Sequence, residues 1–499
     1  MIVFVGSGAA STSLIRAAIL LTFRVCGLER YRLKHHATVM TKRIPILLLS
    51  IFLFAGAVPL IAQQKKAVDA APFDLQDGDT LLFLGDSITH QCLYTQYVED
   101  FFFTRYPDRK IHFHNSGVSG DCAINALDRF DEDVAEFHPK VVTVLLGMND
   151  GAYEDFDAST FEIYSRDMTI LLDQIGKTGA NPIVMSPTMF DHHQLALQME
   201  NPDYRFRTRS FSPQYNALLA YYGGWLRERA GERGLSFVDQ WAPMNQHTFA
   251  QRRKEPDFTL VPDAIHPAPA GHFLMAFELL SQVNPDRKNV SSISIVPGGK
   301  GWRGGAEVSE LVVSEGRDRV TFTHLARSLP WVVPTEPWKS DAKWDAEPGA
   351  PLGVQMTVAG HKLSNERIKV AGLAPGKFEL KIDGELVGTY TDLMLGSKVE
   401  LQSNAKTPQY QQALQVAELN RDRNDLAIRP LRDLWAGVKG IRAKAREAVA
   451  TGKPDPFEAQ LAAKKMQIDE LVELGRSYEE KIRAAAQPRV RHYEIVRLP

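Results

Sequence analysis

The chain has 499 residues and a formal net charge of -2, and its residues are 44% hydrophobic and 24% charged. This composition is that of an ordinary soluble protein, and the near-neutral charge argues against a nucleic-acid or anionic-membrane partner. The length exceeds what one core needs and predicts two to four domains. Three cysteines, Cys26, Cys92 and Cys122, are too few for a zinc ribbon.

Residues 40–62 have the pattern of a signal peptide. A short basic start at residues 41–43 precedes an apolar run at residues 44–61, and the small residue Ala62 follows that run. An uncleaved transmembrane anchor is the alternative, because the run is just long enough to span a bilayer. Pro59 interrupts the run near its end and favours cleavage. We therefore expect a secreted or periplasmic protein, which meets a membrane only if this segment stays attached.

The remaining segments differ in their patterning. We expect an extension or mis-called start upstream of Met40 at residues 1–39, an α/β domain at residues 63–288, a β-rich module at residues 289–405, and a helical hairpin with a tail at residues 406–499.

Export permits a disulfide between Cys92 and Cys122, and two free thiols are the alternative.

Short apolar runs alternate with longer amphipathic stretches from Thr80 to about Val283. The expected strands are Leu81–Leu84, Lys110–His114, Val141–Leu146, Pro182–Met185 and Ser236–Asp239. Strands this short and apolar are typical of a parallel sheet that is covered on both faces. Helices are expected at Tyr94–Tyr106 and Phe161–Ile175, and Gly176 is expected to end the second helix. This order predicts a doubly wound α/β domain.

Turn signals become frequent after Asn289, among them Pro297-Gly298-Gly299 and Asp383-Gly384. They separate short β-like runs at Ser292–Val296, Leu311–Val313, Arg319–Thr323, Ile368–Val370, Phe378–Ile382 and Lys398–Leu401. This pattern predicts a small β-sandwich-like module. From about Pro408 to Ala486 an apolar face recurs at helical spacing, interrupted at Pro454 and Pro456, which predicts an αα-hairpin.

The motif Gly85-Asp86-Ser87 directly follows the predicted strand Leu81–Leu84. Reacting groups gather at the carboxyl ends of strands in an open α/β sheet, and a serine there is exposed on a tight turn. Gly85 permits the backbone to bend sharply. By itself, the motif is more simply explained as a turn that caps a helix.

Two further turns follow predicted strands of the same sheet. The segment Asn115–Asp121 contains Gly117 and Gly120, and a glycine there can present a backbone N–H to a ligand. The segment Gly147–Asp150 contains Asn149, whose side-chain NH₂ is a second donor toward the same crevice. Each segment alone is also an ordinary turn.

A carboxylate and an imidazole are paired in Asp263-Ala264-Ile265-His266-Pro267. A carboxylate three residues before a histidine can reach the imidazole and fix its tautomer. Imidazole is the side chain best suited to remove a serine proton near neutral pH. Because the chain has 14 histidines, such a pair also arises by chance. The ordered set of serine, glycine, asparagine, aspartate and histidine is far more specific than any one motif.

This set resembles the SGNH/GDSL hydrolase family, the GDSL-like lipases and acylhydrolases that include carbohydrate esterases. The resemblance covers roughly Thr80 to Val283 and implies a flavodoxin-like, doubly wound α/β fold that cleaves esters and thioesters, including acetyl groups on sugars. It implies that the nucleophile is Ser87, that its partners are His266 and Asp263, and that the oxyanion hole comprises the N–H groups of Ser87 and Gly120 and the side chain of Asn149.

At two positions the motifs depart from the family pattern or leave a choice open. The serine block has Ile88 where the family name has leucine, at an apolar packing position, so the chemistry is not affected. Gly117 is the alternative to Gly120 as the backbone donor, and position within the block favours Gly120.

With the predicted signal peptide, the resemblance indicates an exported serine esterase that acts on acyl esters, chiefly acetyl esters, of carbohydrates. The substrate is then a small-molecule or polysaccharide ester, and no metal or organic cofactor is needed. One alternative is a lipid or thioester acyl hydrolase, although no long apolar run near the motifs indicates a lipid tunnel. The other is a non-catalytic binding or scaffold protein that retains the fold, although all the catalytic residue types are present.

Other side chains are weaker candidates for substrate contact. His192 and His193 can line the crevice, but a structural or solvated role is simpler. Three tryptophans assigned to the β-rich module can stack on sugar rings, with a core or edge role as the simpler account. They are Trp331, Trp338 and Trp344.

Overall fold

The computed structural model describes residues 74–283, 289–299, 301–334, 336, 338, 347–450 and 457–499. These residues lie in one compact unit that spans Lys65–Pro499. The expected extension and signal segment lie outside the described residues, as do Cys26, Trp344, Pro454 and Pro456. Within the described ranges, no helix is both long enough and apolar enough to cross a bilayer.

A five-stranded parallel sheet forms the centre of the α/β domain, in the order β2-β1-β3-β4-β5. The strands are β1 (Thr80–Gly85), β2 (His112–Gly117), β3 (Val141–Leu145), β4 (Asn181–Met185) and β5 (Ser236–Val238). This is the flavodoxin-like order, and its switch point lies between β1 and β3. The predicted fold class is therefore confirmed.

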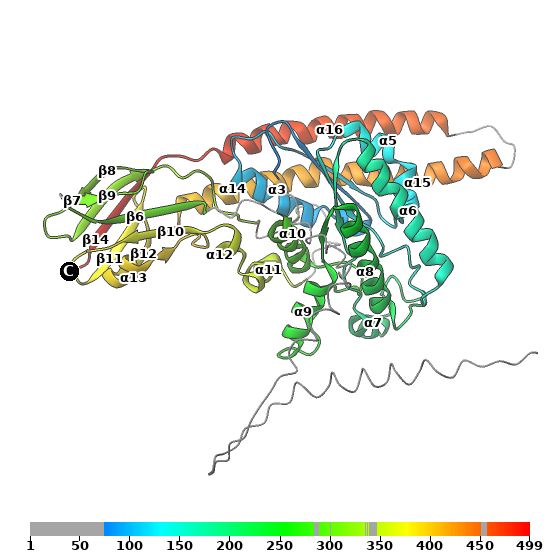
Figure 1. Cartoon of the computed structure of the whole chain (residues 1–499), viewed down its shortest axis with the longest axis horizontal. Helices are drawn as coiled ribbons and strands as arrows, with labels where there is room; N and C mark the ends of the chain where they lie inside the picture. Colours follow the sequence, from blue (N-terminus) through cyan, green and yellow to red (C-terminus); the bar gives the residue numbers. More distant parts are fainter. Residues whose placement is uncertain are drawn as a thin grey trace, which may run out of the picture. The chain divides into compact units, whose positions relative to one another are not determined.

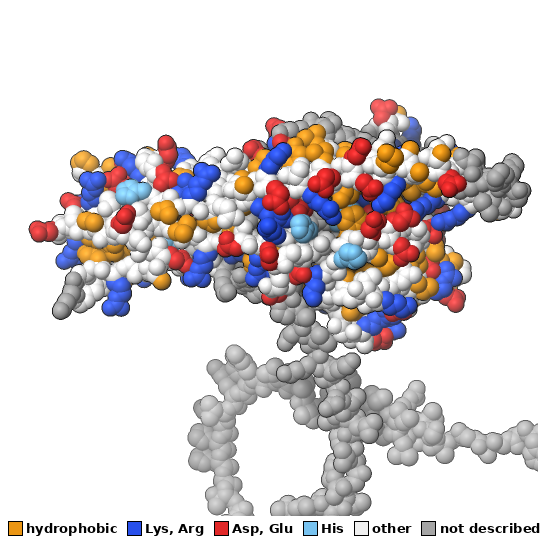
Figure 2. Space-filling view, turned by 90° about the horizontal axis from the view of Figure 1, so that it is seen from above, with side chains coloured by type: hydrophobic (Ala, Val, Ile, Leu, Met, Phe, Trp, Pro, Cys, Tyr) orange, Lys and Arg blue, Asp and Glu red, His pale blue; other side chains and the backbone are white. Residues whose placement is uncertain are grey.

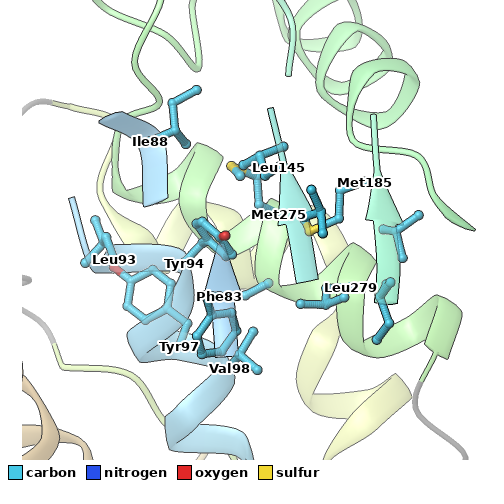
Figure 3. Packing of buried hydrophobic residues seen from close by; sticks show 14 of the residues in the cluster. Phe83, Ile88, Leu93, Tyr94, Tyr97, Val98, Leu145, Met185, Met275 and Leu279 are labelled. Atoms are coloured by element: carbon cyan, nitrogen blue, oxygen red, sulfur yellow. The ribbon is translucent and has the colours of Figure 1, made fainter. Parts of the chain in front are cut away.

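Helices connect the strands and cover the sheet (Figure 1). They are α2 (Ser87–His90), α3 (Leu93–Arg105), α4 (Ala123–Asp128), α5 (Phe130–Asp133), α6 (Ala158–Lys177), α7 (His192–Met199), α8 (Tyr215–Arg233), α9 (Trp241–Arg252) and α10 (Pro269–Val283), with a 3₁₀ turn at Ala135–Phe137. Figure 3 shows side chains of α3 and α10, among them Tyr94 and Met275, packed beside Phe83 and Leu145 of the sheet. Burial on both faces explains why β1, β3 and β4 are mostly apolar, whereas the edge strand β2 carries His114, Asn115 and Ser116.

Two local expectations differ from the structure. Strand β2 begins two residues later than predicted, at His112, and continues to Gly117. Gly176 does not end α6, because the helix continues to Lys177, and Gly179 with φ +84° follows the capping residue Thr178. A left-handed residue after a helix favours glycine strongly, whereas an exposed glycine inside a helix costs only about 1 kcal/mol.

Two β-sheets form the second module. One has the order β13-β10-β6-β7 and the other β12-β11-β14-β9-β8. The strands are β6 (Ser291–Gly298), β7 (Gly301–Arg303), β8 (Val308–Val313), β9 (Arg319–His324), β10 (Glu366–Val370), β11 (Lys377–Ile382), β12 (Glu385–Thr391), β13 (Val399–Glu400) and β14 (Arg491–Arg497), with helix α13 (Asp392–Ser397). The intervening helices α11 (Ala350–Thr357) and α12 (Ala359–Leu363) pack into the core of the α/β domain. Ile295 and Val370 of the first sheet share a buried core with Phe322 and Leu380 of the second, so the module is sandwich-like.

Strand β14 lies in the segment for which we expected only a tail after the hairpin. It pairs with β9 on one side and β11 on the other, so it is an interior strand of the second sheet. Its inward side chains, Tyr493 and Ile495, are buried and alternate with more exposed residues. The chain therefore returns from the end of the hairpin to complete the β module (Figure 1).

The predicted helical hairpin is present and packs along the α/β domain (Figure 1). It comprises α14 (Pro408–Arg423), a π-helical turn (Asn424–Ile428), α15 (Arg429–Ala450) and α16 (Glu458–Ala486). Val416 of α14 and Ile482 of α16 belong to the core of the α/β domain. Buried Arg423 bridges Glu99 of α3 at 3.1 Å and Glu479 of α16 at 3.2 Å. The hairpin and the sheet thus share one interior.

Trp331 and Trp338 belong to the core of the α/β domain rather than to the β module. The ring of Trp331 stacks on Phe273 with centroids 4.8 Å apart, and its Nε1 donates to the carbonyl of Tyr97 at 3.0 Å. The core interpretation is therefore correct for these two tryptophans.

The face seen from the α16 side carries acidic and basic side chains that are interspersed, without a large area of one sign (Figure 2). Ion pairs between the hairpin and the domain contribute to this mixture, such as Lys465 with Glu136 at 3.2 Å. This distribution agrees with the small net charge.

Candidate active site

Three adjacent strands end at one edge of the parallel sheet, because the final residues of β1 pair with those of β2 and β3. Ser87 begins α2 just after β1, Gly120 follows the end of β2, and Asn149 follows the end of β3. These three predicted residues therefore emerge together at the switch point of the sheet, where ligands bind in open α/β folds.

The turn that carries Ser87 is tightly packed. Ser87 is partly exposed, while the flanking residues are buried. A Cβ atom on Gly85 would lie 2.1 Å from Oγ1 of Thr89, so glycine is needed here for space rather than for a positive φ. Oδ1 of Asp86 accepts a hydrogen bond from the N–H of Ile88 at 2.9 Å and caps the helix. The turn is thereby held rigidly.

Ser87, His266 and Asp263 form a hydrogen-bonded line. Nε2 of His266 lies 2.8 Å from Oγ of Ser87, and Nδ1 of His266 lies 2.8 Å from Oδ2 of Asp263. Oδ1 of Asp263 accepts from the backbone N–H groups of Ile265 at 3.0 Å and of His266 at 2.7 Å. This turn before α10 fixes the carboxylate and the imidazole relative to each other.

Arg205 adds a fourth group to this line. Its Nη2 lies 2.6 Å from Oδ2 of Asp263 and 2.8 Å from Nδ1 of His266. Since a guanidinium only donates and a carboxylate is the stronger acceptor, we place the Nδ1 proton on the hydrogen bond to Asp263, with Arg205 donating to the same oxygen. This tautomer leaves Nε2 of His266 free to accept from Ser87.

Asp263 is held in its charged form. Burial opposes ionisation, but the charge and hydrogen bonds of His266, together with Arg205, hold the pKa of this carboxyl well below its ordinary value. A carboxylate that stays charged stabilises an imidazolium beside it.

The structure distinguishes Gly120 from Gly117. The N–H of Gly117 donates to Oδ1 of Asn115 at 2.8 Å and is therefore occupied. Gly120 is exposed and has φ +73°, and no acceptor in the described part of the chain binds its N–H. Gly120 is thus the glycine that can present its N–H to a ligand, as position within the motif favours.

The side chain of Asn149 is oriented by two hydrogen bonds. Tyr153 donates from its hydroxyl to Oδ1 of Asn149 at 3.1 Å, and Nδ2 of Asn149 donates to the carbonyl of Asp121 at 3.1 Å. Nδ2 carries two hydrogens, so one remains for a ligand. Burial raises the pKa of Tyr153 far above its ordinary value, which keeps the phenol protonated as a donor.

A pocket of about 270 Å³ opens beside His266. Most of its lining residues carry hydrogen-bonding side chains, and Tyr204, Pro262 and Pro267 add apolar surface. The lining consists of Gln91, Gln198, Asn201, Asp203, Tyr204, Arg205, Pro262, Asp263, His266 and Pro267.

The remaining candidates lie away from this line. Cys92 is buried and Cys122 half-buried, and both are free thiols. His193 is exposed and pairs with Asp257 at 3.2 Å, which agrees with the solvated role. Among the described residues, no cluster of three His, Cys, Asp or Glu side chains is suited to hold a metal ion.

The comparisons with known proteins identify the domain. The GDSL-like Lipase/Acylhydrolase family model matches residues 83–274. Residues 83–274 belong to this family. An acetylxylan esterase from Geobacillus stearothermophilus is 25% identical over 228 residues, which are 41% of this chain and 94% of the esterase. The family and this relative establish an ester-hydrolysing serine hydrolase.

Solved structures extend the comparison. A gut microbial diltiazem-metabolizing enzyme has a TM-score of 0.70 and 23% identity, and covers 86% of this chain and 100% of its own. It therefore shares the fold well beyond the GDSL domain. A catalytic mutant of the Geobacillus stearothermophilus acetylxylan esterase covers 42% of this chain and 95% of its own, with a TM-score of 0.34 and 23% identity.

Several residues of the GDSL domain site are not predictable from motifs. Arg205 and Tyr204 lie between α7 and α8, in a stretch without a recognisable pattern, and the hydroxyl of Tyr204 donates to the carbonyl of Asp263 at 2.9 Å. Tyr153 lies four residues after Asn149 in the same turn region, and this short distance along the sequence is the only indication that Tyr153 contacts Asn149.

Proposed function

We propose that this GDSL hydrolase is exported and removes acetyl groups from carbohydrate esters, with Ser87 as the nucleophile. The observation that carries the proposal is the line of hydrogen bonds from Oγ of Ser87 through His266 to Asp263. A serine hydroxyl becomes a nucleophile when an adjacent base is oriented by a third group.

The reaction proceeds in two halves. Oγ of Ser87 attacks the ester carbonyl carbon, and Nε2 of His266 takes the hydroxyl proton and returns it to the leaving sugar oxygen. The acetyl group remains on Ser87. Water then attacks this acyl-enzyme with His266 again as the base, which releases acetate and restores the serine.

The oxyanion of each tetrahedral intermediate is stabilised by three donors. These are the N–H groups of Ser87 and Gly120 and the remaining N–H of Asn149. Removal of one such donor typically costs about 3 kcal/mol of transition-state stabilisation.

The pocket beside His266 combines hydrogen-bonding side chains with apolar surface, and a sugar ring can use both. Gln91, Gln198 and Asn201 offer donors and acceptors for hydroxyl groups, and Tyr204 and Pro267 offer apolar faces for a sugar ring. The acetylxylan esterase relative supports the same substrate class.

The test is acetate release from a panel of acetylated polysaccharides and acetylated oligosaccharides by the mature protein. We expect release from at least one carbohydrate and a strong preference for acetyl over long-chain model esters. The Ser87→Ala variant should lose at least about 10³-fold in kcat. Full release by Ser87→Ala would remove this serine from the mechanism, and a preference for long acyl chains would replace the carbohydrate substrate with a lipid.

Export is supported by the basic start and apolar run at residues 40–62. We expect the protein expressed from its native gene to be recovered outside the cytoplasm with its first residue near position 63. Recovery with residues 40–62 still attached would favour the membrane anchor instead.

A further inference from the structure

The loop that carries Gly120 is held by helix α15 of the hairpin. Nζ of Lys439 donates to the carbonyl oxygen of Gly120 at 3.0 Å and to Oδ1 of Asp121 at 2.8 Å. Lys439 lies more than 300 residues away along the chain, so this contact exists only because the hairpin packs against the GDSL domain.

A second tether from α15 reaches the other side of the same loop. The N–H of Ser119 lies 3.2 Å from Nδ1 of His90, and Nε2 of His90 lies 3.2 Å from Oδ1 of Asp433. Because the amide of Ser119 can only donate, the ring proton of His90 lies on Nε2 and is donated to Asp433. Helix α15 thus holds the loop on both sides of Gly120, directly through Lys439 and, through His90, by Asp433.

The base of the loop is apolar and packs on the same helix. Val118 is fully buried in a cluster with Leu431, Trp435 and Val438 of α15. The loop is therefore fixed to the hairpin at Val118, at Ser119 and at the Gly120–Asp121 peptide.

Gly120 itself depends on these contacts. It has a left-handed φ of +73° and is exposed, and Nζ of Lys439 is the nearest atom to the position that its Cβ would take, at 3.9 Å. Asp121 retains Arg129 as a second partner at 2.9 Å, so loss of Lys439 does not leave a buried carboxylate unpaired. Loss of Lys439 therefore frees the Gly120 carbonyl and removes one of the two ion pairs of Asp121, while this buried carboxylate keeps its pair with Arg129.

We infer that Lys439 is a positioning residue that holds Gly120 by its carbonyl oxygen, so that the N–H of Gly120 points at the developing oxyanion. The inference rests on the proposed function, and it gives the hairpin a role in the reaction beyond packing. An oxyanion donor acts only when it is aimed at the transition state, so displacement of Gly120 lowers kcat and leaves substrate binding almost unchanged.

The experiment compares three full-length variants. Lys439→Met removes the charge and the donor while keeping the length of the side chain, and Lys439→Arg restores a donor. Lys444→Met is the matched control, because Lys444 lies on the same helix and is exposed. For each variant, kcat and KM are measured on an acetyl ester, reactive serines are counted by titration with a fluorophosphonate, and Tm is recorded.

We expect Lys439→Met to lower kcat per reactive serine by about 10- to 100-fold. KM should change by less than about twofold, because Lys439 acts on the transition state and does not affect binding of the substrate in its ground state. Lys439→Arg should recover most of the lost kcat, and Lys444→Met should match the native protein.

Three results would overturn the inference: a kcat for Lys439→Met within twofold of the native value, an equal fall for Lys444→Met, or a fall explained entirely by fewer reactive serines. These results are distinct from failure of the proposed function. In that case Ser87→Ala retains activity, whatever the behaviour of Lys439→Met.

Discussion

Arg432 of α15 and Asp133 of α5 form a two-point ion pair in which neither side chain is exposed. Nη1 lies 2.8 Å from Oδ2 and Nη2 lies 2.9 Å from Oδ1. Arg129 and His114 also donate to this carboxylate, at 2.6 Å and 3.0 Å. Burial opposes ionisation of Asp133, but these partners, above all Arg432, keep its pKa below the ordinary value. The hairpin therefore supplies, through Arg432, a positive charge that stabilises the buried carboxylate of Asp133 inside the α/β domain.

The Arg432→Met variant should lower the free energy of unfolding by about 3–5 kcal/mol, because one partner of a buried ion pair is removed. The pair of Arg446 with Asp128, in which Arg446 is exposed on the same helix, supplies the control, and Arg446→Met should cost less than about 1 kcal/mol. Urea unfolding followed by circular dichroism measures both. Equal losses in the two variants would contradict the structural role assigned to Arg432.

The Asp263→Asn variant should lower kcat by about 10³- to 10⁴-fold, since the amide cannot hold the imidazole of His266 in the required tautomer or stabilise its cationic form. The thermal midpoint should change far less than the activity. Asp257→Asn is a suitable control, because Asp257 is exposed and pairs with His193 away from the line. The measurement is steady-state kinetics on an acetyl ester, and a loss of kcat smaller than tenfold would exclude Asp263 as the partner of His266.

Asn149→Ala removes a donor to the oxyanion and should lower kcat by about 10²- to 10³-fold. Tyr153→Phe removes only the hydrogen bond that orients Asn149, so a smaller loss, on the order of tenfold, is expected. Both losses should appear in kcat rather than in KM. A larger loss for Tyr153→Phe than for Asn149→Ala would mean that Tyr153 acts on the substrate directly.

Asp150 should make stability depend on pH. Burial, opposed only in part by hydrogen bonds from backbone N–H groups, raises the pKa of this carboxyl to about 7 from the ordinary 3.8. The native state therefore binds a proton that the unfolded state has lost between these pH values, and stability falls as pH rises through this range. Three pKa units correspond to at most about 4 kcal/mol.

Asp150→Asn removes this dependence, because an amide oxygen can still accept from the N–H of Ala123. The variant should gain stability relative to the native protein as pH is raised from 5 to 8, measured by urea unfolding at each pH. A constant difference between the two proteins across this range would show that Asp150 is ionised in the native state.

Features of the fold that have a local signal were predictable from the sequence. Strands β1, β3 and β4 are mostly apolar runs. The Asp383-Gly384 turn, with φ of +53° and +88°, closes the hairpin between β11 and β12 as its composition predicts. The motifs that contain Ser87, Gly120 and Asn149 could also be predicted from local sequence, because each motif directly follows a strand.

Contacts made by residues that are distant from the motifs along the chain were not predictable. Lys439 and Arg205 meet the site from segments whose own patterns indicate only a solvated helix face and a loop. Strand β14 was missed because its short run of alternating residues is flanked by charges, and its partners β9 and β11 lie more than 100 residues earlier in the chain. Pairing over such separations is set by tertiary packing rather than by local preference.

The interior position of β14 has a consequence for biosynthesis. Ribosomes deliver the chain from its amino end, so the β9 and β11 edges emerge long before residues 491–497 are made. Until then two strands present unpaired backbone groups, which are sites for wrong association between nascent chains. A chain that stopped before residue 491 would leave this gap permanently open, so pairing of β14 is a late step in the folding of the β module.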